Sequence, residues 1–269
     1  MKILVTGATG FIGTRLSETL TNSGHEVRNT ARSLAQNNSA TPEIVTFDLE
    51  SADNLDHLTT GCDAIVHLAG RAHVMSDNPA TSESLYLSAN VDVTKKLAQS
   101  AARTGVKRMI LMSSVKVNGE STTIDTPFTS QDIPYPQDPY GRSKKQAEQA
   151  LWDVTSMSDL EGVVVRPPLV YGPGVRANFA SLIGIVKRGI PLPLGSIRNK
   201  RSFVSIDNLI DCIGAALQSP NAGGQTFLVS DGQDLSTPEL ISSIASALHK
   251  SPMLIPVPTA LLKLAATTV

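Results

Sequence analysis

The chain has 269 residues, which is enough for an α/β domain with a large buried core and a smaller lobe. Its formal net charge of −1 argues against a broad electrostatic partner such as nucleic acid or an anionic membrane surface. Two cysteines, Cys62 and Cys212, have no metal-ligand or redox spacing, so we predict free thiols and no metal site. Because no apolar run approaches the roughly 18 residues of a spanning helix, and no signal-peptide core is present, we expect a cytoplasmic protein with no membrane partner.

Short apolar segments alternate with helical segments, which is the pattern of a parallel sheet covered by helices on both faces. The predicted strands cover residues 2–6, 26–30, 43–47, 63–67, 107–112, 161–166 and 225–229. The predicted helices cover residues 12–22, 82–104, 139–156, 178–187, 207–218 and 236–248. After Arg166, prolines and glycines interrupt the alternation, and such insertions commonly build the substrate side of a site at the sheet edge.

The first strand runs directly into a glycine-rich turn that opens the first helix. A sharp turn, close approach to a pyrophosphate and packing of the helix on the sheet each exclude a Cβ atom, which accounts for the three glycines. The unpaired amides at the start of the helix then face the phosphates. We therefore predict that this segment binds a dinucleotide through Gly7, Thr9, Gly10, Phe11, Ile12 and Gly13.

The end of the second strand indicates which dinucleotide is bound. NAD sites usually place Asp or Glu there to hold the ribose 2′-hydroxyl, whereas NADP sites use Arg. No carboxylate occurs in the segment 27–33, which instead ends on Arg32 and Ser33. The sequence therefore favours NADP(H), with Arg32 on the 2′-phosphate, and NAD(H) stays the alternative.

Two further segments follow predicted strands and reach the same edge of the sheet. Asp48 and Leu49 come just past the third strand and are candidates for holding the adenine. Leu68, Ala69 and Gly70 follow the fourth strand, where the backbone would pass the cofactor. His67 precedes them and is interpreted as structural, because no other histidine lies within metal-ligand spacing.

A tyrosine and a lysine lie four residues apart in Tyr140-Gly141-Arg142-Ser143-Lys144, so they share one helix face. A lysine ammonium favours the tyrosinate, and we expect it to lower the pKa of Tyr140 from about 10 towards neutrality. Asp138 is placed to cap this helix. Ser114, which follows the predicted strand 107–112, can orient a substrate oxygen beside Tyr140. Together with the dinucleotide turn, this pair predicts hydride chemistry on a hydroxyl or ketone.

These motifs and the segment Arg166-Pro167-Pro168-Leu169-Val170-Tyr171-Gly172-Pro173-Gly174 resemble the extended short-chain dehydrogenase/reductases, within them the nucleotide-sugar epimerase/dehydratase family. The resemblance covers nearly the whole chain. It implies an α/β fold with a Rossmann-type doubly wound parallel sheet and a smaller C-terminal substrate-binding lobe. We assign residues 1–166 with 202–219 to the NAD(P)-binding domain and residues 167–201 with 220–269 to the lobe, which we expect to be incomplete at its C-terminus.

The resemblance also assigns roles to single residues. It makes Tyr140 the acid/base, Ser114 the hydroxyl that shares the substrate oxygen, and Lys144 the residue that holds the nicotinamide ribose and tunes Tyr140. Asn90 would support the active-site backbone and Pro167 would lie at the cofactor. The remaining matches are to the sugar nucleotide: Asn178 and Arg201 to its diphosphate, and Pro193 and Leu194 to its base.

The resemblance implies an NAD(P)-dependent oxidoreductase acting at C4 of a nucleoside-diphosphate sugar, with UDP as the expected nucleotide, in a homodimer. Arg32 favours a 4-keto reductase of surface-polysaccharide precursor synthesis, which must exchange NADPH. The alternative is a UDP-glucose or UDP-N-acetylglucosamine 4-epimerase, which keeps its cofactor and usually uses NAD. Val115 and Lys116 replace the Asp-Glu pair of the family's 4,6-dehydratases, which argues against that activity. A non-catalytic NADP(H) sensor is disfavoured because Tyr140 and Lys144 are both present.

Overall fold

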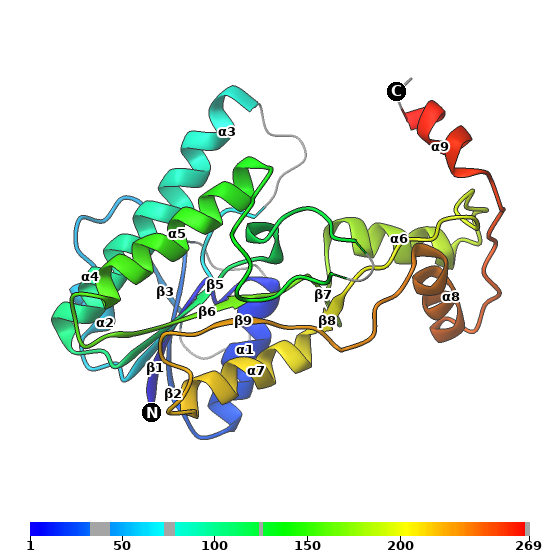
Figure 1. Cartoon of the computed structure of the whole chain (residues 1–269). Coiled ribbons are helices and arrows are strands. Elements are labelled where there is room, and N and C mark those ends of the chain that lie inside the picture. The colour runs from blue at the N-terminus through cyan, green and yellow to red at the C-terminus, as the bar shows by residue number, and fades with distance from the viewer. Residues whose placement is uncertain (33–43, 73–78, 124–125, 267–269) are drawn as a thin grey trace. The chain divides into compact units, whose positions relative to one another are not determined.

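The computed structural model describes residues 1–32, 44–72, 79–123 and 126–266 of the chain. It divides into two compact units (Figure 1). The first unit comprises residues 1–168 with 206–229, and the second comprises residues 169–205 with 230–269.

The first unit is built on one sheet of seven strands, all parallel. The strands are β1 (Lys2–Thr6), β2 (Glu26–Ala31), β3 (Ile44–Thr46), β4 (Ala64–His67), β5 (Arg108–Met112), β6 (Glu161–Arg166) and β9 (Thr226–Leu228). Their order across the sheet is β3-β2-β1-β4-β5-β6-β9. The order reverses at β1, and ligands of such sheets bind at the carboxyl ends of the strands beside that reversal. The predicted Rossmann-type doubly wound sheet is confirmed.

Helices cover both faces of this sheet (Figure 1). They are α1 (Phe11–Asn22), α2 (Asp56–Thr59), α3 (Pro79–Tyr86), α4 (Val93–Thr104), α5 (Pro139–Thr155) and α7 (Ile206–Gln218). Helices α2, α4 and α5 pack together on one face, and α1 packs with α7 on the other. A π-helical segment, Leu87–Asp92, joins α3 to α4, so the predicted helix 82–104 is continuous but begins earlier and contains a bulge.

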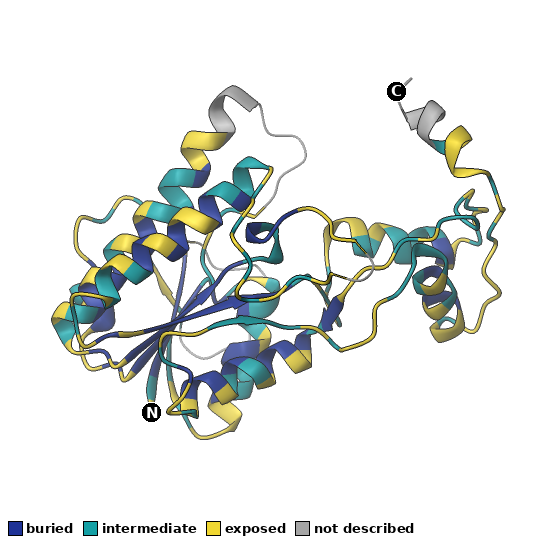
Figure 2. Ribbon diagram, in the orientation of Figure 1, coloured by how far each residue is buried: buried dark blue, intermediate teal, exposed yellow. Residues whose placement is uncertain are grey.

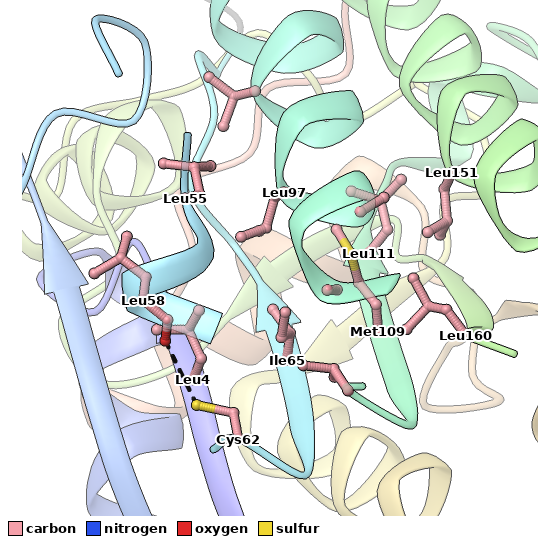
Figure 3. Packing of buried hydrophobic residues seen from close by; sticks show 14 of the residues in the cluster. Leu4, Leu55, Leu58, Cys62, Ile65, Leu97, Met109, Leu111, Leu151 and Leu160 are labelled. Carbon is pink, nitrogen blue, oxygen red and sulfur yellow. Dashed lines mark hydrogen bonds between the residues drawn. The ribbon is translucent and has the colours of Figure 1, made fainter. Parts of the chain in front are cut away.

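One hydrophobic cluster of the first unit lies between the central strands and the helices α2, α4 and α5. Strands β4 and β5 are buried along their whole length, and β1 and β6 are buried after their first residue (Figure 2). Such two-sided burial explains why they read as continuous apolar runs. Leu97 of α4 and Leu151 of α5 pack over Ile65 and Met109 (Figure 3). Cys62 lies buried in this cluster as a free thiol.

In its described residues the second unit contains a parallel pair of strands and three helices. The strands are β7 (Leu169–Tyr171) and β8 (Phe203–Ser205), and the helices are α6 (Ala177–Lys187), α8 (Thr237–Ala247) and α9 (Thr259–Ala266). Its apolar cluster joins α6 to α8 through Val186, Ile241 and Ala245. The Asp231 carboxylate accepts a hydrogen bond from the Tyr171 hydroxyl at 2.7 Å and two from the Ser205 amide at 3.0 and 3.1 Å.

The observed units differ from the predicted division at three places, the smallest being residues 167–168, which we assigned to the lobe and which belong to the first unit. Residues 220–229, which we assigned to the lobe, belong to the first unit, because β9 pairs in parallel with β6 in the register Val164 to Thr226. Residues 202–205, which we assigned to the first domain, belong to the second unit, because β8 pairs with β7. Strands of three residues carry too little apolar pattern to reveal such pairing.

Candidate active site

The glycine turn forms a cradle that side chains would fill. Gly7 has φ of 72°, a conformation that favours glycine, and a Cβ atom there would lie 2.8 Å from the Ala69 nitrogen. A Cβ on Gly13 would lie 2.2 Å from the Gly7 carbonyl oxygen. The amide of Gly10 donates to that same oxygen at 3.0 Å, which closes the turn. Gly10 also caps α1 without a side chain, so the first amides of the helix stay available to an anion. The cradle fits the pyrophosphate of a dinucleotide.

A pocket of 390 Å³ opens beside this cradle, at the carboxyl ends of β1, β2 and β4. It is lined by most of the residues that the sequence assigned to the cofactor: Gly7, Thr9, Gly10, Arg32, Asp48, Leu49, Leu68, Ala69 and Gly70. It is also lined by residues that the sequence did not suggest: Thr30, Ala31, Phe47, Glu50, Arg71, Leu85, Ala89 and Val93. Of the predicted turn residues, Phe11 and Ile12 begin α1 and are partly buried. Ser33 lies outside the described residues.

The NADP interpretation assumed that no carboxylate lies beside Arg32, and the structure shows that one does. Its guanidinium lies 3.6 Å from the Glu50 carboxylate, and its side chain is 78% exposed against 33% for Glu50. A carboxylate is therefore present beside Arg32, although the segment at the end of β2 contains none. It comes from the loop after β3 and not from the end of β2.

Asn90 holds the backbone that follows β4. Its side-chain oxygen accepts a hydrogen bond from the Arg71 amide at 2.8 Å, and its side-chain nitrogen donates to the Arg71 carbonyl oxygen at 3.2 Å. The same nitrogen donates to the Ser143 hydroxyl at 2.9 Å, which links this loop to α5. Asn90 is 1% exposed and lies in the π-helical segment. Such bulges are frequent at functional sites because they redirect one side chain out of the helical register.

Tyr140 lies in the first turn of α5, next to Ser114. The Asp138 carboxylate accepts a hydrogen bond from the Gly141 amide at 2.6 Å, which fixes the start of the helix as predicted. The hydroxyl groups of Tyr140 and Ser114 are hydrogen-bonded. Burial raises the pKa of Tyr140 to about 12, and the Ser114 hydrogen bond offsets only part of that rise. The expected lowering of the Tyr140 pKa is thus absent, because desolvation of the phenolate dominates.

Lys144 follows one turn later and is 7% exposed. Its ammonium donates to the Met112 carbonyl oxygen at 2.9 Å, directly before the two serines at the end of β5. Burial lowers the pKa of Lys144 to about 8, and the Glu148 carboxylate counteracts this effect. Burial and the charge of Lys144 lower the pKa of His67 to about 3. The His67 ring hydrogen-bonds the Thr6 hydroxyl at 2.7 Å, in agreement with its structural interpretation.

A buried ion pair, which the sequence did not suggest, lies one turn along α5 from Lys144. Arg166 donates to both oxygens of Glu148 at 2.9 and 2.7 Å, and both side chains are 5% exposed. The Ser113 hydroxyl also donates to Glu148, and Arg166 donates to the Asn118 side chain at 2.9 Å. The pair therefore ties α5 to the end of β5, to β6 and to the turn after Ser114. Pro167 follows Arg166, and its carbonyl oxygen accepts from the Val115 amide at 3.0 Å.

The residues assigned to the sugar nucleotide belong to the second unit. Asn178 lies exposed in the first turn of α6, directly after Ala177, whose φ of 55° is unusual for a residue with a side chain. Pro193 is exposed, whereas Leu194 packs against the apolar cluster of this unit. Arg201 is exposed, and its backbone forms two 3.0 Å hydrogen bonds with Leu235.

Comparison with known proteins identifies the family. The model of the NAD dependent epimerase/dehydratase family matches residues 3–230. The chain belongs to this family. A UDP-glucose 4-epimerase of Vibrio cholerae is 45% identical over 95% of the chain and 78% of that protein. The fold also matches a UDP-glucuronic acid 4-epimerase of Bacillus cereus, solved with UDP-glucuronic acid and NAD, with a TM-score of 0.81, 26% identity, and coverage of 95% of this chain and 87% of that one.

A second solved structure, MoeE5 in complex with UDP-glucose and NAD, gives the same TM-score of 0.81 at 27% identity and covers 96% of this chain and 85% of that one. The expected family and enzyme class are thereby confirmed: the chain is a nicotinamide-dependent enzyme of nucleotide-sugar chemistry. Within the described residues, no helix is long and apolar enough to cross a membrane. No group of three or more potential metal ligands occurs in that part of the chain either.

Proposed function

We propose that this family member is a UDP-sugar 4-epimerase that keeps NAD bound through the catalytic cycle. The observation that carries the proposal is the 45% identity to the UDP-glucose 4-epimerase of Vibrio cholerae over 95% of the chain. Two solved relatives of the same fold, which are 27% and 26% identical to this chain, hold NAD together with a UDP-sugar. This support favours the epimerase over the 4-keto reductase that Arg32 suggested.

The residues of this chain divide the chemistry at C4 in a simple way. Tyr140 takes the proton of the C4 hydroxyl and returns it, while the Ser114 hydroxyl hydrogen-bonds the same oxygen. An NAD held by the glycine cradle would supply reversible hydride transfer at C4, and its positive charge in the oxidised form would favour the tyrosinate. Lys144 adds a second positive charge, held by the Met112 carbonyl oxygen one turn along α5. Val115 and Lys116 bring no carboxylate directly after Ser114, which fits an activity without dehydration.

The sugar nucleotide is assigned to residues of the second unit. Asn178 and Arg201 are proposed to bind its diphosphate, and Pro193 with Leu194 to flank its base. An exposed guanidinium suits a diphosphate, because it can donate two parallel hydrogen bonds to phosphate oxygens. Homodimerisation through the helices predicted at residues 82–104 and 139–156 stays a prediction. Within these segments, the exposed positions of α4 and α5 are polar, namely Lys95, Gln99, Arg103, Lys145, Gln146, Gln149 and Asp153.

The test is to incubate the purified chain with UDP-glucose, UDP-N-acetylglucosamine and UDP-glucuronic acid and to resolve C4 epimers by NMR. An epimerase interconverts a UDP-sugar and its C4 epimer without net change in nicotinamide absorbance. Tyr140→Phe should reduce turnover by about 10²–10⁴-fold, because it removes the proton carrier. Tyr135→Phe, an exposed tyrosine of the loop before α5, is the matched control and should retain activity.

A 4-keto reductase is the second candidate, favoured by the absence of a carboxylate at the end of β2. It would oxidise one NADPH for each 4-keto sugar nucleotide consumed and would leave the three UDP-sugars unchanged. That result would replace the epimerase proposal.

A further inference from the structure

Hydrogen bonds of its amide, its carbonyl oxygen and its carboxylate hold Glu50 in place. Its amide donates to the Asp48 carboxylate at 3.0 Å, and its carbonyl oxygen accepts from the Lys96 ammonium at 2.8 Å. Its carboxylate accepts a hydrogen bond from the Ser88 hydroxyl at 3.2 Å. The Glu50 carboxylate is therefore a fixed feature of the pocket, whereas the side chain of its partner Arg32 is 78% exposed.

The position of this carboxylate gives it a function in cofactor recognition. Glu50 lines the same pocket as Arg32, which directly follows β2. Doubly wound sheets distinguish a ribose 2′-hydroxyl from a 2′-phosphate at the end of this strand. We propose that Glu50 supplies the carboxylate that β2 lacks, and so makes this chain select NAD over NADP. The inference rests on the proposed function only in that this pocket takes the adenosine end of the dinucleotide.

Charge balance in the pocket supports this selection. The titratable side chains among its described lining residues are two carboxylates, Asp48 and Glu50, and two guanidinium groups, Arg32 and Arg71. The Arg32 charge is already opposed by Glu50 at 3.6 Å, and Arg71 lies over the Tyr86 ring at 5.7 Å. A 2′-phosphate carries about −1.5 to −2 charges at neutral pH. It would meet two carboxylates and an arginine that is already paired, whereas a 2′-hydroxyl can donate a hydrogen bond to Glu50.

The magnitude follows from a partly exposed charge pair. Repulsion between a phosphate and a carboxylate several ångströms apart, weakened by water and salt, corresponds to about a tenfold change in affinity. Glu50→Gln removes the charge but keeps an oxygen that can accept from Ser88. We therefore expect the NADP dissociation constant to fall about tenfold in Glu50→Gln, and NAD binding to weaken by about two- to fivefold.

The experiment measures dissociation constants of NAD, NADP, 5′-AMP and 2′-phospho-AMP by calorimetry, with no sugar nucleotide present. The two adenosine fragments differ only by the 2′-phosphate, so they isolate its contribution. Glu26→Gln is the matched control, because it removes a carboxylate from the other end of β2, where Glu26 pairs with Lys2 at 2.5 Å. It should leave the ratio of NADP to NAD affinity within about twofold. Arg32→Gln in the Glu50→Gln background should abolish the NADP gain, because it removes the guanidinium that a 2′-phosphate would otherwise meet.

Three outcomes would overturn the inference. The first is a wild-type chain that prefers NADP and loses this preference in Arg32→Gln. The second is a Glu50→Gln variant whose ratio of NADP to NAD affinity equals that of Glu26→Gln. The third is a chain that binds neither dinucleotide. The first result would restore the arginine as the 2′-phosphate ligand. A chain that selects NAD through Glu50 but epimerises no UDP-sugar would instead refute the proposed function alone. An active epimerase whose affinity ratio ignores Glu50 would refute this inference alone.

Discussion

Replacement of Glu148 by glutamine tests whether its buried ion pair with Arg166 maintains the fold. In Glu148→Gln the Arg166 guanidinium stays 5% exposed but loses the charge that its 2.9 and 2.7 Å hydrogen bonds meet. Of the partners shown for it, only the Asn118 side chain at 2.9 Å is unchanged. Breaking a buried pair in this way costs about 3–5 kcal/mol. At roughly 2–4 °C per kcal/mol for a chain of this size, the melting temperature should fall by about 6–20 °C.

Thermal and urea unfolding, followed by circular dichroism, measure this loss. Asp207→Asn is the control, because it makes the same chemical change in an exposed pair, Arg15 with Asp207 at 3.2 Å, whose side chains are 53% and 63% exposed. That variant should stay within about 1 kcal/mol of the wild type. A double replacement of Glu148 and Arg166 by methionine should recover most of the stability, since apolar residues of similar volume can replace a buried pair. A Glu148→Gln variant as stable as Asp207→Asn would refute the reasoning.

Two further predictions concern the sheet edge. His67 has a folded pKa of about 3 against an ordinary value of 6.5, so the unfolded chain binds its proton first and stability should fall as pH drops from 6.5 to 3, by up to about 5 kcal/mol. Urea unfolding at pH 7 and pH 4 should show a smaller acid loss in His67→Gln, and an identical loss would contradict the assignment. Gly13→Ala should weaken NAD binding at least about tenfold, because its Cβ would lie 2.2 Å from the Gly7 oxygen. Gly214→Ala on α7, where a Cβ meets nothing within 4 Å, is the control and should bind NAD normally.

The sequence predicted the sheet because strands buried on both faces leave a direct record in the chain. Each predicted strand from 2–6 to 161–166 overlaps an observed one, and the glycine turn reaches the pocket that it predicted. Strands β7 and β8 were not predicted, because a strand of three residues is too short to show an alternating period. The π-helical bulge at Asn90 was also missed, because it changes the helical register without changing the composition.

The electrostatics of the site depend on tertiary packing and were therefore predicted less well. The sequence placed Tyr140 and Lys144 on one helix face, but the direction of the Tyr140 pKa shift depends on how much water the surrounding strands exclude. Glu50 lies 18 residues after Arg32, in the loop that follows β3. Only the parallel pairing of β2 with β3 brings the two residues together. Glu148 and Arg166 are likewise distant in sequence, and an i, i+4 neighbour such as Lys144 would have been the simpler guess for Glu148.

The distribution of proposed roles between the two units predicts how kinetic effects should separate. The glycine cradle, Asn90, Ser114, Tyr140 and Lys144 lie in the first unit, whereas Arg201 lies in the second. If Arg201 binds the diphosphate, Arg201→Met should raise KM for the sugar nucleotide by about 10–100-fold, the value of a lost charge-assisted hydrogen bond pair. The NAD dissociation constant should be unchanged.

Arg198→Met tests the specificity of this effect, because Arg198 is an exposed arginine three positions earlier in the same basic segment. A KM change of the same size in both variants would indicate general attraction by the segment and not a ligand role for Arg201. A change in the NAD dissociation constant in Arg201→Met would contradict the division of roles itself. Since dinucleotide binding is measured without the sugar nucleotide, the two explanations are separated in one set of titrations.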